Sequence, residues 1–202
     1  MIKFTTHTLC KIVTCFSLVG PLSCFAITTS EVFQKYPNKS LVETGTFMGS
    51  GVENALKAGF KDVYSIELSK DLYDYCTDKF KTNPCVHLYL GDSSVVLEKV
   101  LFNINEPATF WLDGHYSEGV TAKGNKNSPI LEELQVIGKH KIKNHTILID
   151  DVRLFGTKEF DNVTLAQIIA ALKKINPNYV ISYEDGYTHN DVLVAKVPDA
   201  KK

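Results

Sequence analysis

Carboxylates follow apolar, strand-like segments at two places in the chain, where they could bind a cation. Asp113 comes directly after "FWL", and the pair Asp150 and Asp151 comes directly after "TILI". If these segments are neighbouring parallel strands, they lie ~4.8 Å apart and their terminal carboxylates converge. Converging carboxylates repel one another unless a cation or a proton lies among them. Oxygen ligation of this kind suits magnesium, manganese or calcium rather than zinc.

A second interpretation of this acidic pair involves no metal. In it, Asp150 and Asp151 cap the following segment or form ion pairs with Arg153 and Lys158. The presence of Asp113 and His115 at the same predicted edge favours the metal.

A glycine-rich turn, residues 43–51 within "LVETGTFMGSG", suggests a second kind of chemistry. Gly45, Gly49 and Gly51 allow backbone conformations closed to other residues and let a ligand approach the main chain. The start of the following helix supplies free N–H groups. Glu67, at the end of the next strand, is placed to accept two hydrogen bonds from a ribose diol. These features indicate a ligand of the adenosine type.

The spacing of the glycines separates two classes of adenosine ligand. The dinucleotide fingerprint G-x-G-x-x-G fits poorly, because its nearest match starts at Gly49 and ends in Asn54. The pattern is instead E-x-G-x-x-x-G-x-G, with Glu43 two residues before the first glycine. That carboxylate would repel a pyrophosphate, whereas it would attract an ammonium and a sulfonium. S-adenosylmethionine carries both cations, so the turn favours it over NAD.

Alternating strand and helix patterns position these residues. Strand patterns occupy 40–43, 63–67, 86–90, 108–112 and 146–149, and two further β runs surround a polar turn in "YVISYEDGYTHNDVLVAK". Helical patterns occupy 51–58, 70–80, 93–101, 129–138 and 165–175. The alternation predicts an α/β fold with a Rossmann-like, doubly wound, mostly parallel seven-stranded sheet and a C-terminal antiparallel hairpin. Ligands of such sheets bind beyond the carboxyl ends of the strands.

Four segments in chain order, "VETGTFMGSG", "VYSIEL", "LYLGDSS" and "FWLDGH", resemble the successive motifs of class I S-adenosylmethionine-dependent methyltransferases. The resemblance covers roughly residues 30–197, and the terminal hairpin is similar to the sixth and seventh strands of that family. It implies that Glu67 binds the ribose and that Asp92 and Ser93 bind the adenine edge. Asp92 also fits a helix N-cap, which is compatible with that role. The other cofactor-binding residues that the resemblance implies are Glu43, Gly45, Thr46, Gly49 and Asp113.

The acidic residues resemble those of a subgroup, the metal-dependent O-methyltransferases, which include catechol and sugar methyltransferases. That subgroup carries acidic ligands after the fourth and fifth strands, which implies metal ligands at Asp113, Asp150 and Asp151. In that subgroup the metal, which we expect to be magnesium here, orients two substrate oxygens and lowers the pKa of a hydroxyl. The subgroup also has a Lys or His three residues past the first ligand, where this chain has Tyr116. We therefore nominate His115 as the base, with Asp113 as the second catalytic residue.

The expected function is that of an enzyme that transfers a methyl group from S-adenosylmethionine to a hydroxyl oxygen of a small molecule or sugar. Three alternatives stay open. A Rossmann-like protein that binds NAD or a nucleotide sugar would use the same Glu67. A metal-dependent hydrolase would bind the metal without the cofactor, and a non-catalytic binding protein would not need Asp113.

Chain length and composition limit which of these functions are possible. The chain has 202 residues, of which 44% are hydrophobic, enough for one domain with a full core. Its 22 basic and 23 acidic residues give a net charge of -1, which excludes the basic footprint of a nucleic-acid-binding protein. The expected partner is a small hydroxylated substrate, and the sequence indicates no oligomeric state.

Residues 1–26 have the pattern of an export signal, and the domain is expected at 27–202. Lys3 and Lys11 flank a polar start, and an uncharged, mostly apolar stretch then ends in small residues. That stretch is shorter than the ~20 residues of a membrane-spanning helix and contains Pro21, so no permanent membrane anchor is expected. The protein is expected to be secreted or periplasmic if the signal operates, and cytoplasmic otherwise.

Three further expectations concern side chains and one loop. Cys76 and Cys85 form either a disulfide, if the compartment is oxidising, or two ordinary thiols. Glu132 and Glu133 are expected to face solvent on a helix. The polar loop at residues 116–128 is long enough to be either functional or disordered.

Overall fold

Strands and helices alternate along the chain, and the computed structural model describes residues 30–116, 124 and 126–198. The strands are β1 (Ser40–Thr44), β2 (Asp62–Glu67), β3 (Val86–Leu90), β4 (Thr109–Leu112), β5 (Thr146–Ile149), β6 (Val180–Glu184) and β7 (Val192–Lys196). The helices are α1 (Ser30–Lys35), α2 (Ser50–Ala58), α3 (Lys70–Phe80), α4 (Ser93–Leu101), α5 (Ile130–Lys139) and α6 (Leu165–Ile175). Two 3-10 turns, η1 (Val152–Leu154) and η2 (Lys158–Phe160), follow β5.

The strands form one sheet in the order β3-β2-β1-β4-β5-β7-β6. β1 pairs in parallel with β2 on one side and with β4 on the other, and β3 and β5 continue the parallel part outward. β7 runs antiparallel to both β5 and β6. The predicted doubly wound, mostly parallel seven-stranded sheet with a C-terminal hairpin is therefore confirmed. The direction of winding reverses between β1 and β4, which is where ligands bind in sheets of this kind.

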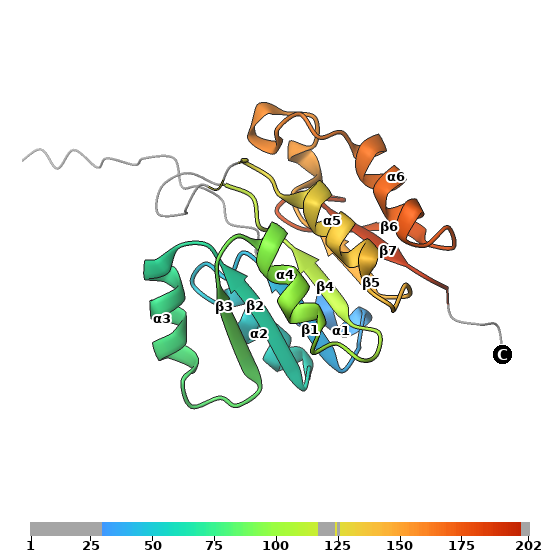
Figure 1. Cartoon of the computed structure of the whole chain (residues 1–202). Coiled ribbons are helices and arrows are strands. Elements are labelled where there is room, and N and C mark those ends of the chain that lie inside the picture. Colours follow the sequence, from blue (N-terminus) through green and yellow to red (C-terminus); the bar gives the residue numbers. More distant parts are fainter. Residues whose placement is uncertain (1–29, 117–123, 125, 199–202) are drawn as a thin grey trace, which may run out of the picture.

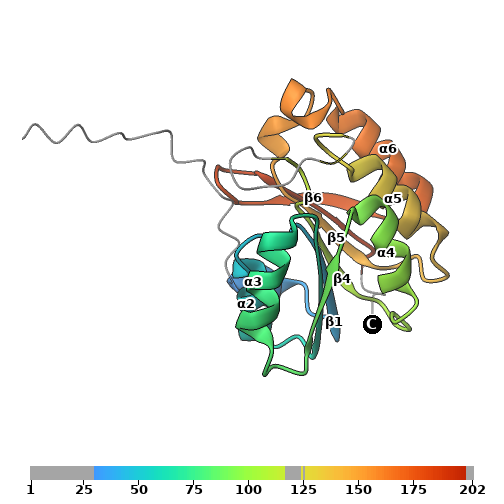
Figure 2. The same ribbon diagram turned by 60° about the vertical axis from the view of Figure 1, so that its left-hand side comes forward.

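Consecutive side chains of the central strands point to opposite faces of the sheet, and each face has its own core. Leu41 and Leu148 cluster with Phe33 of α1 on one face. Their neighbours Val42 and Ile147 cluster with buried residues of α4, α5 and α6 on the other. Figures 1 and 2 show these three helices on one side of the sheet and α1, α2 and α3 on the other. Burial on both faces explains why the central strands β1, β4 and β5 are nearly continuous apolar runs.

The sequence patterns missed three short elements, α1, η1 and η2. α1 has 6 residues, fewer than the ~11 over which a helical period can be recognised. Tertiary contacts stabilise it, because the ring of Phe33 packs edge-on against Phe60 and Trp111.

Two predicted segments, the export signal at 1–26 and most of the polar loop (117–123 and 125), lie outside the described residues. Among the helices that the structure describes, none has the length and apolar content needed to cross a bilayer. Cys76 and Cys85 are free thiols in the structure, so it contains two ordinary thiols rather than the disulfide that an oxidising compartment could form. The thiol of Cys76 donates to the carbonyl oxygen of Phe47, with a distance of 3.1 Å between Sγ and O.

Candidate functional site

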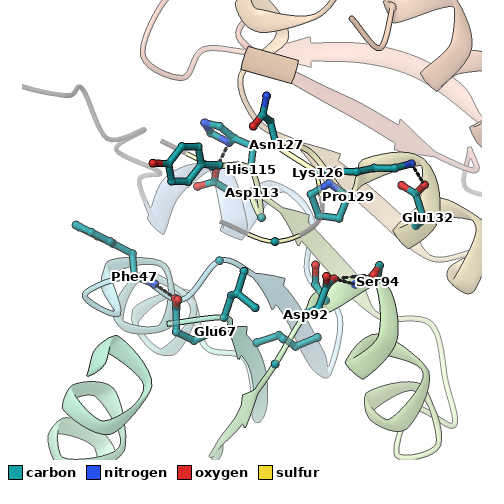
Figure 3. Close-up of a pocket in the computed structure, with 18 of the residues that line it drawn as sticks. Phe47, Glu67, Asp92, Ser94, Asp113, His115, Lys126, Asn127, Pro129 and Glu132 are labelled. Carbon is teal, nitrogen blue, oxygen red and sulfur yellow. Dashed lines mark hydrogen bonds and ion pairs between the residues drawn. The ribbon is translucent and has the colours of Figure 1, made fainter. Parts of the chain in front are cut away.

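A cavity of about 290 Å³ lies at the carboxyl ends of four strands, beside the point where the winding reverses. This volume is near the lower end of the range for small-molecule sites. Each strand end supplies part of the wall: Gly45 follows β1, Glu67 ends β2, Asp92 follows β3 and Asp113 follows β4. Figure 3 shows Asp113 and His115 across the cavity from Glu67 and Asp92. The ends of these four strands therefore share one cavity.

The glycine turn packs closely against other parts of the protein. Gly45 has a φ of +85°, and a Cβ there would lie 2.3 Å from the carbonyl oxygen of Asp113. A Cβ on Gly51 would lie 1.8 Å from Oε1 of Glu43. A side chain at either position therefore collides with the protein itself before any ligand is considered. These glycines let the end of β1 lie against β4 and let α2 begin directly over a buried carboxylate.

Glu43 lies behind the cavity wall. Its carboxylate is 2% exposed and accepts a hydrogen bond from Oγ of Ser65, which is also 2.6 Å from Oγ1 of Thr46. Burial raises the pKa of Glu43 to about 8. Glu43, Thr46 and Gly49 do not line the cavity as the described residues define it. Their cofactor-binding roles stay predictions.

Glu67 presents a fixed carboxylate to the cavity. Its Oε2 accepts the backbone N–H of Phe47 and its Oε1 accepts that of Ser69, each at 2.8 Å. Burial raises the pKa of Glu67, and these backbone donors act in the opposite direction. The backbone N–H of Leu68 is a third donor to this carboxylate. A carboxylate has about four acceptor positions, so one remains for a hydroxyl group of a ligand.

Asp92 caps α4 and also lines the cavity. Its Oδ1 accepts the backbone N–H of Ser94 at 2.9 Å and the hydroxyl of Ser94 at 2.6 Å, which confirms the predicted N-cap. Asp92, Ser93 and Ser94 all line the cavity, so capping leaves room for a ligand. The hydroxyl of Ser93 does not take part in the cap, and it donates to Oε1 of Glu133 at 2.5 Å.

The expectation that Glu133 faces solvent is wrong. Its side chain is 1% exposed, and burial raises its pKa to about 7. Glu133 lies three residues after Ile130, in the apolar stripe that Leu134 and Ile137 continue, and this spacing could have revealed its burial. Glu132 is partly exposed, lines the cavity and forms an ion pair with Lys126, which Figure 3 shows.

His115 bridges two carboxylates. Its Nδ1 is 3.3 Å from Oδ1 of Asp113, and its Nε2 is 3.0 Å from Oδ2 of Asp151. Burial alone would lower the pKa of His115, but the hydrogen bond to Asp113 and the charges of both carboxylates outweigh it and raise that pKa. The two carboxylates therefore favour the protonated form of this ring more than water would. Its predicted role as a base requires one of the two contacts to open.

The two acidic residues that follow β5 are both buried, and they are bound differently. Oδ1 of Asp150 accepts the backbone N–H of Asp151 at 2.8 Å, whereas Oδ2 of Asp150 has no hydrogen-bond partner among the described residues. Burial and the charges of Asp113 and Asp151 raise the pKa of Asp150. Asp151 has a φ of +64°, an uncommon conformation for a residue other than glycine.

Sequence reasoning missed Asp191, which joins this acidic group. It is buried, its Oδ1 accepts the backbone N–H of Arg153 at 3.0 Å, and its Oδ2 pairs with Nη1 of Arg153. The same Nη1 is 2.5 Å from Oδ1 of Asp151, so the predicted ion pair with Arg153 forms. β7 pairs antiparallel with β5, so the residue before β7 lies beside the residues after β5. An acid next to a predicted terminal hairpin was the available signal.

The acidic residues form two overlapping sets of candidate metal ligands. Ligand atoms of Asp113, His115 and Asp151 lie within 4.8 Å of one another, and so do those of Asp150, Asp151 and Asp191. The predicted ligands therefore gather in one region, although Asp113 and Asp150 belong to different sets. Four carboxylates face one guanidinium and one imidazole here, an excess of negative charge that a divalent cation would offset.

Solved methyltransferase structures share this fold. A methyltransferase of Podospora anserina with bound S-adenosylhomocysteine (SAH) has a TM-score of 0.52 at 15% identity, and the match covers 80% of this chain and 72% of that one. For the O-methyltransferase of Bacillus cereus in complex with SAH, the TM-score is 0.54 at 12% identity, with 84% and 78% covered. For the O-methyltransferase TomG of Streptomyces achromogenes in complex with S-adenosylmethionine, it is 0.53 at 14% identity, with 84% and 78% covered.

Comparisons of the sequence with protein-family models and with curated proteins find no match. Identities this low leave the likeness at the level of architecture, so the shared property is the fold of S-adenosylmethionine-dependent methyltransferases.

Proposed function

We propose that this protein is a methyltransferase that transfers the methyl group of S-adenosylmethionine to a hydroxyl oxygen of a small molecule or sugar, with the help of a divalent metal. The observation that carries the proposal is the placement of Glu67 and Asp113 in one cavity at the reversal point of this sheet. One carboxylate suits a ribose diol, and the other suits the cationic end of the same ligand.

The chain offers a consistent set of contacts to such a cofactor, which when bound supplies an electrophilic methyl group. Glu67 keeps acceptor capacity for a hydroxyl of the ribose. Asp92 uses Oδ1 for the helix cap, so its Oδ2 can accept from the adenine edge. Gly45 and Asp113 flank the opposite end of the cavity, where the negative charge of Asp113 would favour an ammonium or a sulfonium.

A divalent metal, with magnesium as the first choice, fits the acidic residues beside the cavity. The supporting observation is Oδ2 of Asp150, a buried oxygen without a partner among the described residues, next to Asp113 and Asp151. We propose these three residues as ligands, and the metal would lower the pKa of the acceptor hydroxyl. His115 would then take the proton from that hydroxyl on the nitrogen that its carboxylate contact releases.

Calorimetry on the full chain tests the cofactor. SAH is titrated with and without magnesium, and NAD serves as the control ligand. We expect saturable binding of SAH and no binding of NAD. Binding of NAD alone would support a dinucleotide-binding protein, and magnesium binding without SAH binding would support a metal-dependent hydrolase. If SAH, NAD and magnesium all fail to bind, the proposal that the protein is an enzyme is refuted.

Methyl transfer is then measured on a panel of catechols and sugars, with Asp113→Ala as the test of the metal mechanism. We expect the variant to lose both the transfer and its dependence on magnesium. Unchanged transfer and unchanged SAH binding in Asp113→Ala would show that the metal mechanism is wrong.

A further inference from the structure

We infer that Glu133 is a positioning residue, which fixes Ser93 and Asp113 as two facing walls of the cavity without touching the ligand. The inference rests on the proposed function for its consequence, which is cofactor affinity. It rests on the structure alone for the contacts that carry it.

The carboxylate of Glu133 forms hydrogen bonds with two hydroxyl groups at the carboxyl edge of the sheet. The hydroxyl of Ser93, the first residue of α4, donates to its Oε1 at 2.5 Å. The hydroxyl of Thr44, the last residue of β1, also hydrogen-bonds to the carboxylate of Glu133. All three side chains are buried, so these hydrogen bonds have no competition from solvent.

Thr44 extends this set of contacts to β4. Its Oγ1 accepts the backbone N–H of Asp113 at 3.3 Å, and its carbonyl oxygen lies 3.2 Å from the same nitrogen. Glu133 therefore reaches Ser93 directly and Asp113 through Thr44. Both end residues line the cavity, whereas Glu133 and Thr44 do not.

Gly114 shows how closely the three oxygens converge. A Cβ built on Gly114 would lie 3.1 Å from Oε1 of Glu133, 3.2 Å from Oγ1 of Thr44 and 3.4 Å from Oγ of Ser93. The segment that follows β4 thus rests directly on this hydrogen-bonded group. Because Glu133 belongs to α5, it also ties that helix to the connections after β1, β3 and β4.

The contacts predict a specific pattern of amide hydrogen exchange in the full chain, measured by NMR without any ligand. In Glu133→Ala the N–H of Asp113 should exchange about tenfold faster, because Thr44 loses the partner that orients its hydroxyl. Glu133→Gln keeps an acceptor oxygen and the side-chain volume, so it should restore most of the protection.

Two control variants on the same helix separate positioning from loss of stability. Ile137→Ala removes a fully buried apolar side chain, which can accept no hydrogen bond, and Gln135→Ala changes an exposed residue. Neither should change exchange at Asp113 relative to the remaining β4 amides. The inference would be wrong if Glu133→Ala and Ile137→Ala accelerated the exchange of all β4 amides equally. It would also be wrong if Glu133→Ala left the exchange of the Asp113 amide unchanged.

SAH affinity gives the second readout. Glu133→Ala and Ser93→Ala should each weaken SAH binding about tenfold, and the double variant should lose little more, because both changes break one hydrogen bond. Additive losses would contradict the inference. If the unchanged chain does not bind SAH, the proposed function fails, whereas the exchange pattern still decides the role of Glu133.

Discussion

Buried carboxylates determine the character of the site at the residue scale. Glu67 has a backbone donor on each oxygen, so it is held ready for neutral donors such as hydroxyl groups. Asp150 has one oxygen without a partner among the described residues and other carboxylates close by. A buried oxygen of this kind is stabilised by a proton or a cation. The two residues should therefore respond differently to the same change, carboxylate to amide.

Glu67→Gln should weaken SAH binding about tenfold and lower the free energy of unfolding by about 1–2 kcal/mol. The amide has only one acceptor oxygen, so one of the two backbone N–H groups loses its partner. Calorimetry and urea unfolding measure the two effects. Glu98→Gln, an exposed change on α4, is the control and should alter neither quantity. Full SAH affinity in Glu67→Gln would remove the ribose role of Glu67.

Asp150→Asn should have the opposite effect on stability. Without metal it should raise the free energy of unfolding at pH 7 by about 1 kcal/mol, because the folded chain must otherwise protonate a carboxyl whose pKa is raised well above that of the unfolded chain, and an amide has no such cost. The unchanged chain should gain stability on addition of magnesium, as a ligand that binds the folded state requires. Asp150→Asn should reduce that gain. Thermal unfolding with and without magnesium measures both, and an equal magnesium effect in the two proteins would exclude Asp150 as a ligand.

At the scale of elements, α2 begins and ends at glycines that serve different purposes. Gly51, in its first turn, leaves room for the buried carboxylate of Glu43. Gly59, after its last turn, has a φ of +96° and no atom within 4 Å of a built Cβ. Gly59 is therefore needed for its backbone conformation alone, whereas Gly51 is needed for space.

Gly51→Ala should destabilise the protein more than Gly59→Ala. We expect about 1 kcal/mol for Gly59→Ala, the cost of a left-handed conformation in a residue with a Cβ. Gly51→Ala must displace either α2 or Glu43, and overpacking of this kind costs about 1–3 kcal/mol. Urea unfolding of the two variants tests the order. A smaller loss for Gly51→Ala would show that Glu43 moves away without cost.

At the level of the whole molecule, His145 connects the starts of β4 and β5, at the edge of the sheet opposite the site. It is fully buried, and its Nδ1 accepts the backbone N–H of Ala108 at 3.1 Å. Its Nε2 is 2.9 Å from Nδ1 of His140. Burial lowers the pKa of His145 to about 4, so the folded protein keeps this ring neutral.

Stability should therefore depend on pH through His145. An unfolded histidine takes up a proton as the pH falls below about 6.5, while the folded one does so only near 4. The contribution of the neutral ring is present above pH 6.5 and is lost as the pH falls toward 4, by up to about 3 kcal/mol. His145→Asn keeps an acceptor for Ala108 without a titrating group. The difference in unfolding free energy between chain and variant should shrink from pH 7 to pH 4.5, and a constant difference would contradict the assignment.

Local patterns in the amino-acid sequence were enough to predict the order of the elements, the glycine turn and the positions of Glu67, Asp92 and Asp113 at strand ends. These follow from local patterns, because a parallel strand in an alternating α/β chain has its carboxyl end at one edge of the sheet. The local sequence around Asp92 likewise determined the helix cap.

The contacts among these side chains, and their burial, depend on the packing of elements that are distant in the chain. Asp191 reaches the acidic group because β7 pairs antiparallel with β5, and Glu133 reaches Ser93 because α5 packs over α4. His115 lies between two carboxylates from different strand ends. Such contacts join residues far apart in the chain, and burial changes the energy of a charge far more than sequence neighbours do. The electrostatics of the site are therefore a property of the folded molecule.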